Sequence, residues 1–248
     1  MHDLLRKGCM RMAHEENFLY VKSRYLRIFP EEASFRRHLS IHDDASNSCS
    51  EDDIKLRRFP EEILQLVNLR YIAIACHAKV PPSIAVLWNL QTLIVEDPLG
   101  IACKLPMKIW NMLQLRHLKF SRVGFYFSSL ARRLENLLTL SMIDNLDYNH
   151  IIIRTPNLNK LGIHYNPDSS HSLDHFVHLQ KLETLKILFD SPANSTFNHI
   201  SLPSNLKKIT LEGGRIDWKN MRIFGSLPNL EVLKLHDFAF LGQRVVTK

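Results

Sequence analysis

FPEEILQLVNLRYIAI, residues 59–74, contains the two sequence patterns that decide the fold of this chain. It ends in L-x-x-L-x-L, where Ile, Val, Phe or Met can replace Leu. This pattern occurs eight times: LRYIAI (69–74), LQTLIV (90–95), LRHLKF (115–120), LLTLSM (137–142), LNKLGI (158–163), LETLKI (182–187), LKKITL (206–211) and LEVLKL (230–235). The stretch begins with an apolar-Pro-x-x-Ile frame, which returns in VPPSIAVLWNL (80–90) and LPMKIWNMLQL (105–115). Successive copies start 21, 25, 22, 21, 24, 24 and 24 residues apart, which identifies an internal repeat.

This repeat predicts an α/β fold, a leucine-rich-repeat solenoid of about eight repeats with a parallel sheet on its concave face. Side chains alternate between the two faces of a strand, so the leucines point inward and fill the core. The Pro-x-x-Ile segment should form a turn or short helical piece on the convex side, because Pro fixes φ and ends the preceding element. A single repeat cannot bury its own apolar face, so stacked neighbours provide the stability.

The residues between the leucines are predicted to face solvent on the concave side, in three rows along the sheet. The first row is Tyr71, Thr92, His117, Thr139, Lys160, Thr184, Lys208 and Val232. The central row is Ala73, Ile94, Lys119, Ser141, Gly162, Lys186, Thr210 and Lys234. The third row is Ala75, Glu96, Ser121, Ile143, His164, Leu188, Glu212 and His236.

These rows predict a mildly basic concave face, weighted toward its C-terminal half. They hold five lysines, three histidines and two acids. Such a face would dock an acidic protein partner or an acidic stretch of the same polypeptide. An alternative is that the rows only reflect a basic chain, whose net charge is +7 and whose pI is about 9.3. The predicted partner-binding residues are Tyr71, His117, Lys119, Lys160, His164, Lys186, Lys208, Lys234 and His236.

Motifs for chemistry are missing from the 248 residues, so we expect no enzyme activity, no catalytic residue and no metal site. The sequence has no phosphate-binding loop, no G-x-S-x-G and no G-x-G-x-x-G. Basic residues are spread along the solenoid rather than clustered on one helix, which disfavours nucleic-acid binding. Trp88 and Trp110 are expected to pack rather than to bind a ligand.

The sequence also bears on the compartment. No apolar run is long enough for a transmembrane helix, and Leu4-Leu5 is followed at once by charge, unlike a secretory signal. We therefore predict a cytoplasmic protein, with peripheral association at membranes as an option. The cysteines are widely spaced and are expected to be free thiols: Cys9, Cys49, Cys76 and Cys103.

The residues before the repeats have a different texture. Residues 1–32 carry apolar residues at helical spacing, followed by short apolar elements. RRHLSI (36–41) resembles an irregular first repeat strand, and DDASNSCSEDD (43–53) reads as an exposed acidic loop. We therefore divide the chain into 1–32, an irregular first repeat and acidic linker at 33–58, and the repeat domain at 59–248.

Several of these segments resemble one family. MHDLLRKGCMRMAHEENFLYV (1–21) resembles the end of the nucleotide-binding (NB-ARC) region of plant intracellular immune receptors, where a Met-His-Asp motif closes the winged-helix subdomain. RRHLSIH, FPEEILQLVNLRYIAI, PPSIAVLWNLQTLIV, LPMKIWNMLQLRHLKF and LPNLEVLKLHDFAF resemble the repeats of late blight resistance proteins, which are NB-LRR receptors of the coiled-coil class. The resemblance assigns 1–32 to a winged-helix remnant of the NB-ARC region.

The resemblance implies a function in defence. Family members exchange ADP for ATP when a pathogen effector is perceived, oligomerise, and trigger a defence response that includes hypersensitive cell death. The repeats contribute recognition and autoinhibition, so the implied partners are an effector or guarded host protein and the receptor's nucleotide-binding module. Met1, His2 and Asp3 match the nucleotide-sensing motif, but the P-loop and other nucleotide-binding strands are missing. The chain is therefore expected to bind no cofactor, ADP and ATP being expected only for a full-length family member.

We compare three hypotheses for the kind of protein to which this chain belongs. The chain would be a fragment or truncated form of a receptor under the first hypothesis, and a free-standing repeat scaffold, such as a decoy or adaptor, under the second. An extracellular receptor ectodomain is disfavoured, because the sequence lacks a signal peptide and has Pro-x-x-Ile in place of the Gly-Ile-Pro repeat of such receptors. The C-terminal repeat has no evident polar cap, so we expect exposed core leucines there.

Overall fold

A computed structural model describes residues 18–22, 37–42, 59–75, 79–96, 103–125, 132–144, 148–168, 173–193 and 200–241. Within them, eleven strands form one sheet in which every pair of neighbours is parallel. They are β1 (Phe18–Lys22), β2 (His38–His42), β3 (Tyr71–Ala75), β4 (Thr92–Glu96), β5 (Cys103–Leu105), β6 (His117–Phe125), β7 (Thr139–Asp144), β8 (Lys160–Tyr165), β9 (Thr184–Phe189), β10 (Lys208–Glu212) and β12 (Val232–His236).

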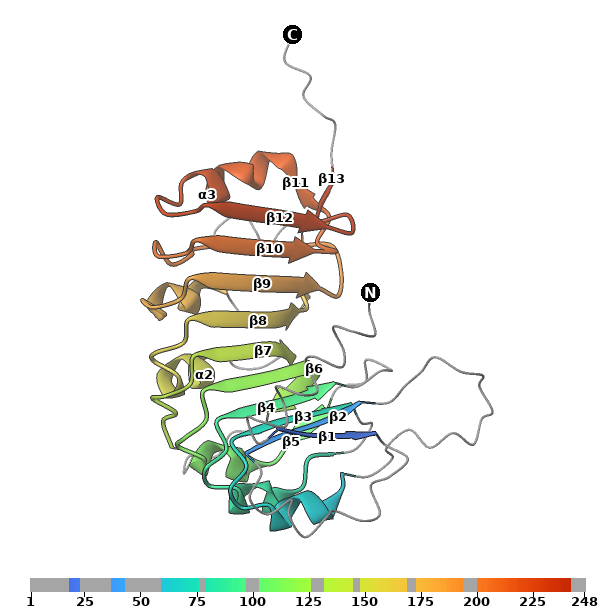
Figure 1. The fold of residues 1–248 in the computed structure, drawn as a ribbon. Helices are drawn as coiled ribbons and strands as arrows, with labels where there is room; N and C mark the ends of the chain where they lie inside the picture. Colours follow the sequence, from blue (N-terminus) through green and yellow to red (C-terminus); the bar gives the residue numbers. More distant parts are fainter. Residues whose placement is uncertain are drawn as a thin grey trace, which may run out of the picture.

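The strands stack in chain order, which confirms the leucine-rich-repeat solenoid (Figure 1). The spatial order is β1-β2-β3-β4-β6-β7-β8-β9-β10-β12, with β5 paired to β6. All eight predicted strands are present, from β3 to β12. A two-stranded sheet, β11 (Ile216–Asp217) with β13 (Phe240–Leu241), lies in the last described repeat.

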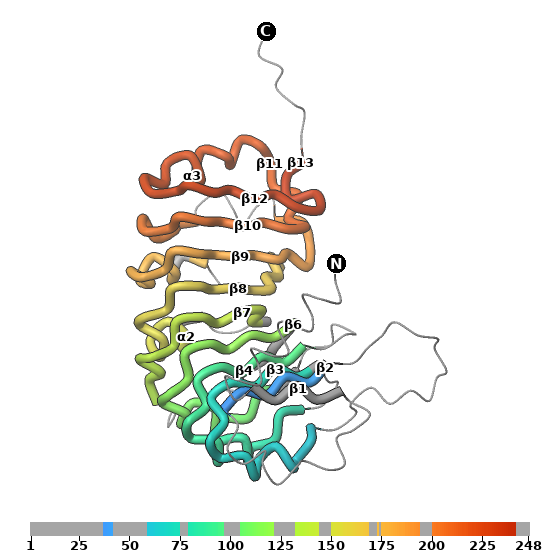
Figure 2. Tube along the Cα trace, viewed as in Figure 1, coloured from blue at the N-terminus to red at the C-terminus, as the bar shows by residue number. Residues whose placement is uncertain are grey.

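Short helical segments precede many of the strands, and Figure 2 shows the trace passing through one turn of chain per repeat. They are η3 (Glu61–Gln65), η4 (Pro82–Val86), η5 (Met107–Asn111), α2 (Tyr148–Arg154), η6 (Asp174–His178), η8 (Trp218–Asn220) and α3 (Met221–Gly225). Each apolar-Pro-x-x-Ile frame forms a 3-10 helix, with Pro60, Pro81 or Pro106 as the residue before it. The Ile of each frame is fully buried and packs into the same core as the strand leucines.

The sheet begins before the predicted repeat domain. RRHLSI supplies β2, as expected, and β1 pairs with β2 in parallel register. The predicted boundary at residue 32 therefore falls between two strands of one sheet, because Phe18–Lys22 belongs to the sheet. Two segments lie outside the described residues, namely 1–17 and 43–58. They include the apolar residues at helical spacing and the acidic stretch.

The regular register is interrupted between β6 and β8. Leu140 pairs with Leu161, but the next pair along the strands is Ile143 with Ile163, so β7 carries one extra residue. Met142 absorbs the extra length at a φ of 64°, in the left-handed region. Gly162 makes room for this bulge, because a Cβ there would lie 3.2 Å from the Met142 nitrogen.

The bulge corrects one prediction. Ile143 was expected on the solvent-facing side, but it is completely buried in the core. The motif LLTLSM assigns the core position to Met142, and the extra residue passes that position to Ile143. By register the backbone of Asp144 then pairs with His164.

Candidate partner-binding face

The nine predicted partner-binding residues come to one face of the sheet. The first row forms an unbroken line of paired residues from Tyr71 to Val232. It contains four of the nine, namely Tyr71, His117, Lys160 and Lys208. Lys119, Lys186 and Lys234 lie in the central row, and His164 and His236 lie in the third.

Their exposure is uneven. Lys119, Lys160, Lys234 and His236 are exposed, whereas the other five are half-buried. Besides Ile143, three row positions expected to face solvent are buried: Ala73, Thr139 and Gly162. All three are small residues, and Gly162 has no side chain at all.

The lysines of this face differ in their ion pairing. Lys186 Nζ lies 3.1 Å from Glu212 Oε2, so its charge is compensated by the adjacent strand. Among the described residues, no ion pair involves Lys119, Lys160, Lys208 or Lys234. Four cationic groups on this face therefore have no acidic partner within the described part of the chain.

His117 reports the positive potential at the centre of the face. Its Nδ1 lies 3.0 Å from Thr139 Oγ1 in the neighbouring strand. Burial lowers the pKa of His117, and the nearby charges of Lys119, Lys160 and Arg116 lower it further. The imidazole is therefore neutral at pH 7, and the cations that disfavour its protonation would favour an anionic group.

His164 has a neighbour of its own. Its Nδ1 lies 3.7 Å from Asp190 Oδ1, and its side chain is largely covered. A partner would meet less of His164 than of His236, whose side chain is exposed. At the other end of the sheet, burial and then the Glu96 charge raise the pKa of Tyr71, so its phenol stays protonated at neutral pH.

The face is hollowed near its middle. Ile94, Glu96, Lys119, Phe120, Ser121 and Ser141 line a shallow groove of about 350 Å³. It lies over β4, β6 and β7, so the lysine of the groove belongs to the N-terminal half of the rows. The sequence predicted a face weighted toward its C-terminal half and did not indicate this groove.

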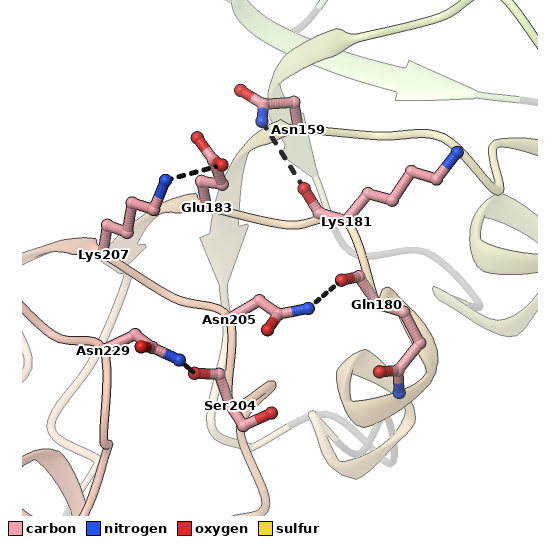
Figure 3. A network of polar contacts seen from close by, with 8 residues as sticks. All are labelled: Asn159, Gln180, Lys181, Glu183, Ser204, Asn205, Lys207 and Asn229. Atoms are coloured by element: carbon pink, nitrogen blue, oxygen red, sulfur yellow. Dashed lines mark hydrogen bonds and ion pairs between the residues drawn. The ribbon is translucent and has the colours of Figure 1, made fainter.

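A second groove, of about 470 Å³, lies where the strands begin and was not predicted (Figure 3). Its wall is built by amides that bond to the preceding repeat: Asn229 Nδ2 donates to the Ser204 carbonyl at 2.9 Å, and Asn205 Nδ2 donates to the Gln180 carbonyl. The same position donates in earlier repeats, from Asn157 to the Glu135 carbonyl at 2.8 Å. The recurring Asn-Leu dipeptide was the sequence signal for this ladder.

Of the two lysines that line the second groove, Lys207 is compensated by an acid and Lys181 donates to Asn157 Oδ1 at 2.7 Å. Lys207 Nζ lies 2.9 Å from Glu183 Oε1, as drawn in Figure 3. The hydrogen bond from Lys207, and then one from Asn159, lower the pKa of Glu183. The bond to Glu183 raises the pKa of Lys207. The amide ladder and this ion pair join neighbouring repeats, so we assign the second groove a structural role.

Of the two tryptophans that were predicted to pack, one is buried and the other is largely exposed. Trp110 is buried, with 1% of its surface exposed, but Trp88 is 65% exposed. They do not occupy equivalent positions, because Trp88 stands two residues before its repeat leucine and Trp110 stands five residues before its own. Trp88 was expected to pack, but most of its side chain is exposed to solvent.

The remaining predictions concern the nucleotide-sensing motif, metal binding and membrane-spanning helices. Met1, His2 and Asp3 lie outside the described residues. Within the described part of the chain, no cluster of three or more His, Cys, Asp or Glu side chains has a geometry for a metal ion. None of the helices seen there is long and apolar enough to cross a membrane.

The stacked L-x-x-L-x-L strands and their exposed rows define a leucine-rich-repeat protein. No protein-family model matches the chain. Among solved structures, the chain is similar to an internalin (inlF) from Listeria monocytogenes, with a TM-score of 0.41 and 13% identity, covering 87% of this chain and 82% of that one.

Sequence relatives are more specific. The chain is 33% identical to late blight resistance protein R1-A of Solanum demissum over 209 residues, which is 77% of this chain and 16% of that protein. It is also 33% identical to the late blight resistance protein homolog R1B-14 of the same species over 198 residues, covering 73% of this chain and 15% of the relative. The chain belongs to this family of plant disease resistance proteins, and it spans about 15% of the length of these relatives.

Proposed function

We propose that this chain is a non-enzymatic recognition and autoinhibition module of a plant immune receptor. In this role it contributes to effector-triggered defence and to hypersensitive cell death. Membership of the late blight resistance protein family supports a role in plant defence. The single observation that supports docking is the group of four lysines without acidic partners on the sheet face.

The spacing of these lysines suits a protein surface. Lys160 and Lys208 are separated by one strand in the first row, and neighbouring strands are about 4.8 Å apart, so their backbones lie about 10 Å apart. Acidic side chains spread over a folded partner could meet both lysines at once. We propose an acidic surface of an effector, of a guarded host protein or of the receptor's own nucleotide-binding module as the occupant.

The proposal assigns no cofactor to this segment, and ADP or ATP would be bound by the nucleotide-binding module of a longer family member. His2 would then be a sensor residue whose ligand site is supplied elsewhere. We propose the cytoplasm as the compartment, with peripheral attachment at membranes as a further option.

The test measures binding of the full chain to the nucleotide-binding module of a related coiled-coil-class receptor. Lys160→Glu combined with Lys208→Glu should weaken the Kd at least tenfold at low salt, because about 1.4 kcal/mol of charge attraction is lost and replaced by repulsion. Wild-type binding should weaken as salt is raised.

The matched control uses the compensated lysine. Lys186→Gln combined with Glu212→Gln removes the compensated pair without changing the net charge of the face, so it should change the Kd much less than the double reversal. Binding that is unchanged by the double reversal and insensitive to salt would rule out electrostatic docking on this face.

A further inference from the structure

Exposed apolar side chains gather on the turns that follow the three 3-10 helices η3, η4 and η5. Val67, Trp88 and Leu113 each stand two residues before the repeat leucine, and their exposed fractions are 42%, 65% and 41%. Val86, the last residue of η4, is 52% exposed, and its carbonyl accepts a hydrogen bond from the Trp88 N–H at 2.9 Å. We call Val67, Val86, Trp88 and Leu113 the apolar stripe.

The stripe is built by one backbone geometry repeated three times. The residue before each of Val67, Trp88 and Leu113 has nearly the same conformation. These residues are Leu66, Leu87 and Met112, with φ from −80° to −88° and ψ from 61° to 77°. Each stripe residue that follows donates its N–H to the carbonyl two residues earlier, at 2.9 to 3.2 Å. Equal turns in stacked repeats place the three side chains side by side.

Two arginines border the stripe. Arg70 and Arg116 are exposed and follow the repeat leucines of the same turns. Backbone hydrogen bonds fix their row, since Gln91 N–H donates to the Arg70 carbonyl at 2.8 Å and Arg116 N–H donates to the Gln91 carbonyl at 2.7 Å. With one repeat between them, the two arginine backbones are about 10 Å apart.

The charges in this row differ between the halves of the solenoid. Further along the same row, Lys207 is neutralised by Glu183. For Arg70 and Arg116, no ion pair with another described residue exists. The N-terminal repeats, which carry the exposed apolar side chains, therefore also carry the arginines of this row that have no acidic partner among the described residues.

We propose that the apolar stripe with Arg70 and Arg116 docks an acidic protein segment that presents apolar side chains to Trp88. Trp and Arg are the residue types most enriched at the energetic centres of protein interfaces. The partner's carboxylates would meet the two guanidinium groups, which bind them in bidentate geometry. This surface lies on the turns before the strands, and it does not depend on the role proposed for the sheet face.

The surroundings favour a polypeptide over a lipid surface. Asn89 and Gln114 directly follow Trp88 and Leu113, and their amides can donate and accept hydrogen bonds.

The test uses a phage-displayed library of random dodecapeptides selected on the full chain. Enriched peptides should combine aromatic or aliphatic residues with two or more acids. Synthetic copies should bind Trp88→Ala about 30-fold more weakly than wild type, the size of a hot-spot truncation. Arg70→Glu with Arg116→Glu should also weaken them, and this second variant keeps the apolar side chains.

The control is Trp218→Ala. Trp218 is 41% exposed but lies in the last described repeat, where its ring stacks against Phe240 at 5.0 Å, so peptide binding should not change. Circular dichroism verifies that each variant is folded. The proposal is overturned by a lack of enrichment, by enriched peptides without acids, or by equal binding to Trp88→Ala. Binding of wild type, but not of Trp88→Ala, to phosphatidylcholine vesicles containing phosphatidylserine would reassign the stripe to membranes.

Discussion

The C-terminal repeat should tolerate a core truncation that the preceding repeat does not. Leu211 and Leu235 occupy the last leucine position of adjacent repeats and pair with each other across β10 and β12. Leu211 is fully buried, whereas 38% of Leu235 is exposed. Truncating each to alanine removes the same three carbons from the same place in the motif, so the two variants differ only in burial.

The expected losses follow from that burial. Three buried carbons at about 0.8 kcal/mol each give about 2.4 kcal/mol, and an enclosed cavity raises the cost of Leu211→Ala to about 3–4 kcal/mol. Leu235 has about 60% of its surface buried and its truncation opens no closed cavity, which leaves about 1.5 kcal/mol. Leu211→Ala should therefore lower the free energy of unfolding by about 2 kcal/mol more than Leu235→Ala.

Urea denaturation followed by circular dichroism measures both variants. The comparison requires an unchanged slope with urea, because a change in slope would indicate a loss of two-state unfolding. Equal losses for the two variants would refute the reasoning, since they would show that Leu235 is covered as fully as Leu211.

Two further predictions concern the sheet face. The pKa of His117 is lowered in the folded chain, so the unfolded state binds more protons. The free energy of unfolding should therefore fall as the pH drops through 6.5 and level off below the lowered pKa. His117→Gln should flatten this dependence on pH, as measured by urea titrations at several pH values. Gly162→Val places a branched side chain against Met142 and Ser141, where even a Cβ would be within 3.2 to 3.3 Å, and should cost about 1–3 kcal/mol. An unchanged melting temperature for Gly162→Val would show that the bulge can move aside.

Much of the fold followed from the repeat alone. The spacing of the leucines located the eight repeat strands between β3 and β12, but not β5 or β11, because only one face of each repeat strand can enter the core. The frame around Ile63, Ile84 and Ile109 likewise located three 3-10 helices. Strand β2 followed from RRHLSI, whereas the pairing of Phe18–Lys22 with it needed the structure, because nothing local in that stretch marks it as part of the sheet.

The bulge could not be read from the sequence. LLTLSMID offers Met142 and Ile143 as neighbouring apolar residues, and either could enter the core. The choice depends on the length of the adjacent strands, since β6 also shifts register against β7 between Lys119 and Val123. Such competition between strands is a tertiary effect, which a repeat motif does not record.

The sequence predicted which residues share the sheet face, but not the charge balance among them. Alternation placed Lys160, Lys186 and Lys208 on the sheet face, but it could not show that Glu212 compensates Lys186 alone among them. Exposure of Trp88 was missed because Trp88 and Trp110 were both expected to pack. Counting residues back from each leucine separates its position from that of Trp110 and would have found it.

The equal spacing of the last strands has a consequence for how such genes change. Lys160, Thr184, Lys208 and Val232 pair in sequence, and each lies 24 residues after the one before. Unequal crossing-over that duplicates or deletes one 24-residue unit here would restore the same neighbours across the junction. Across the bulge between β6 and β8 the units are not equivalent, so recombination there would misalign the core. The C-terminal repeats are therefore the part of this chain in which repeat number can vary most readily between alleles.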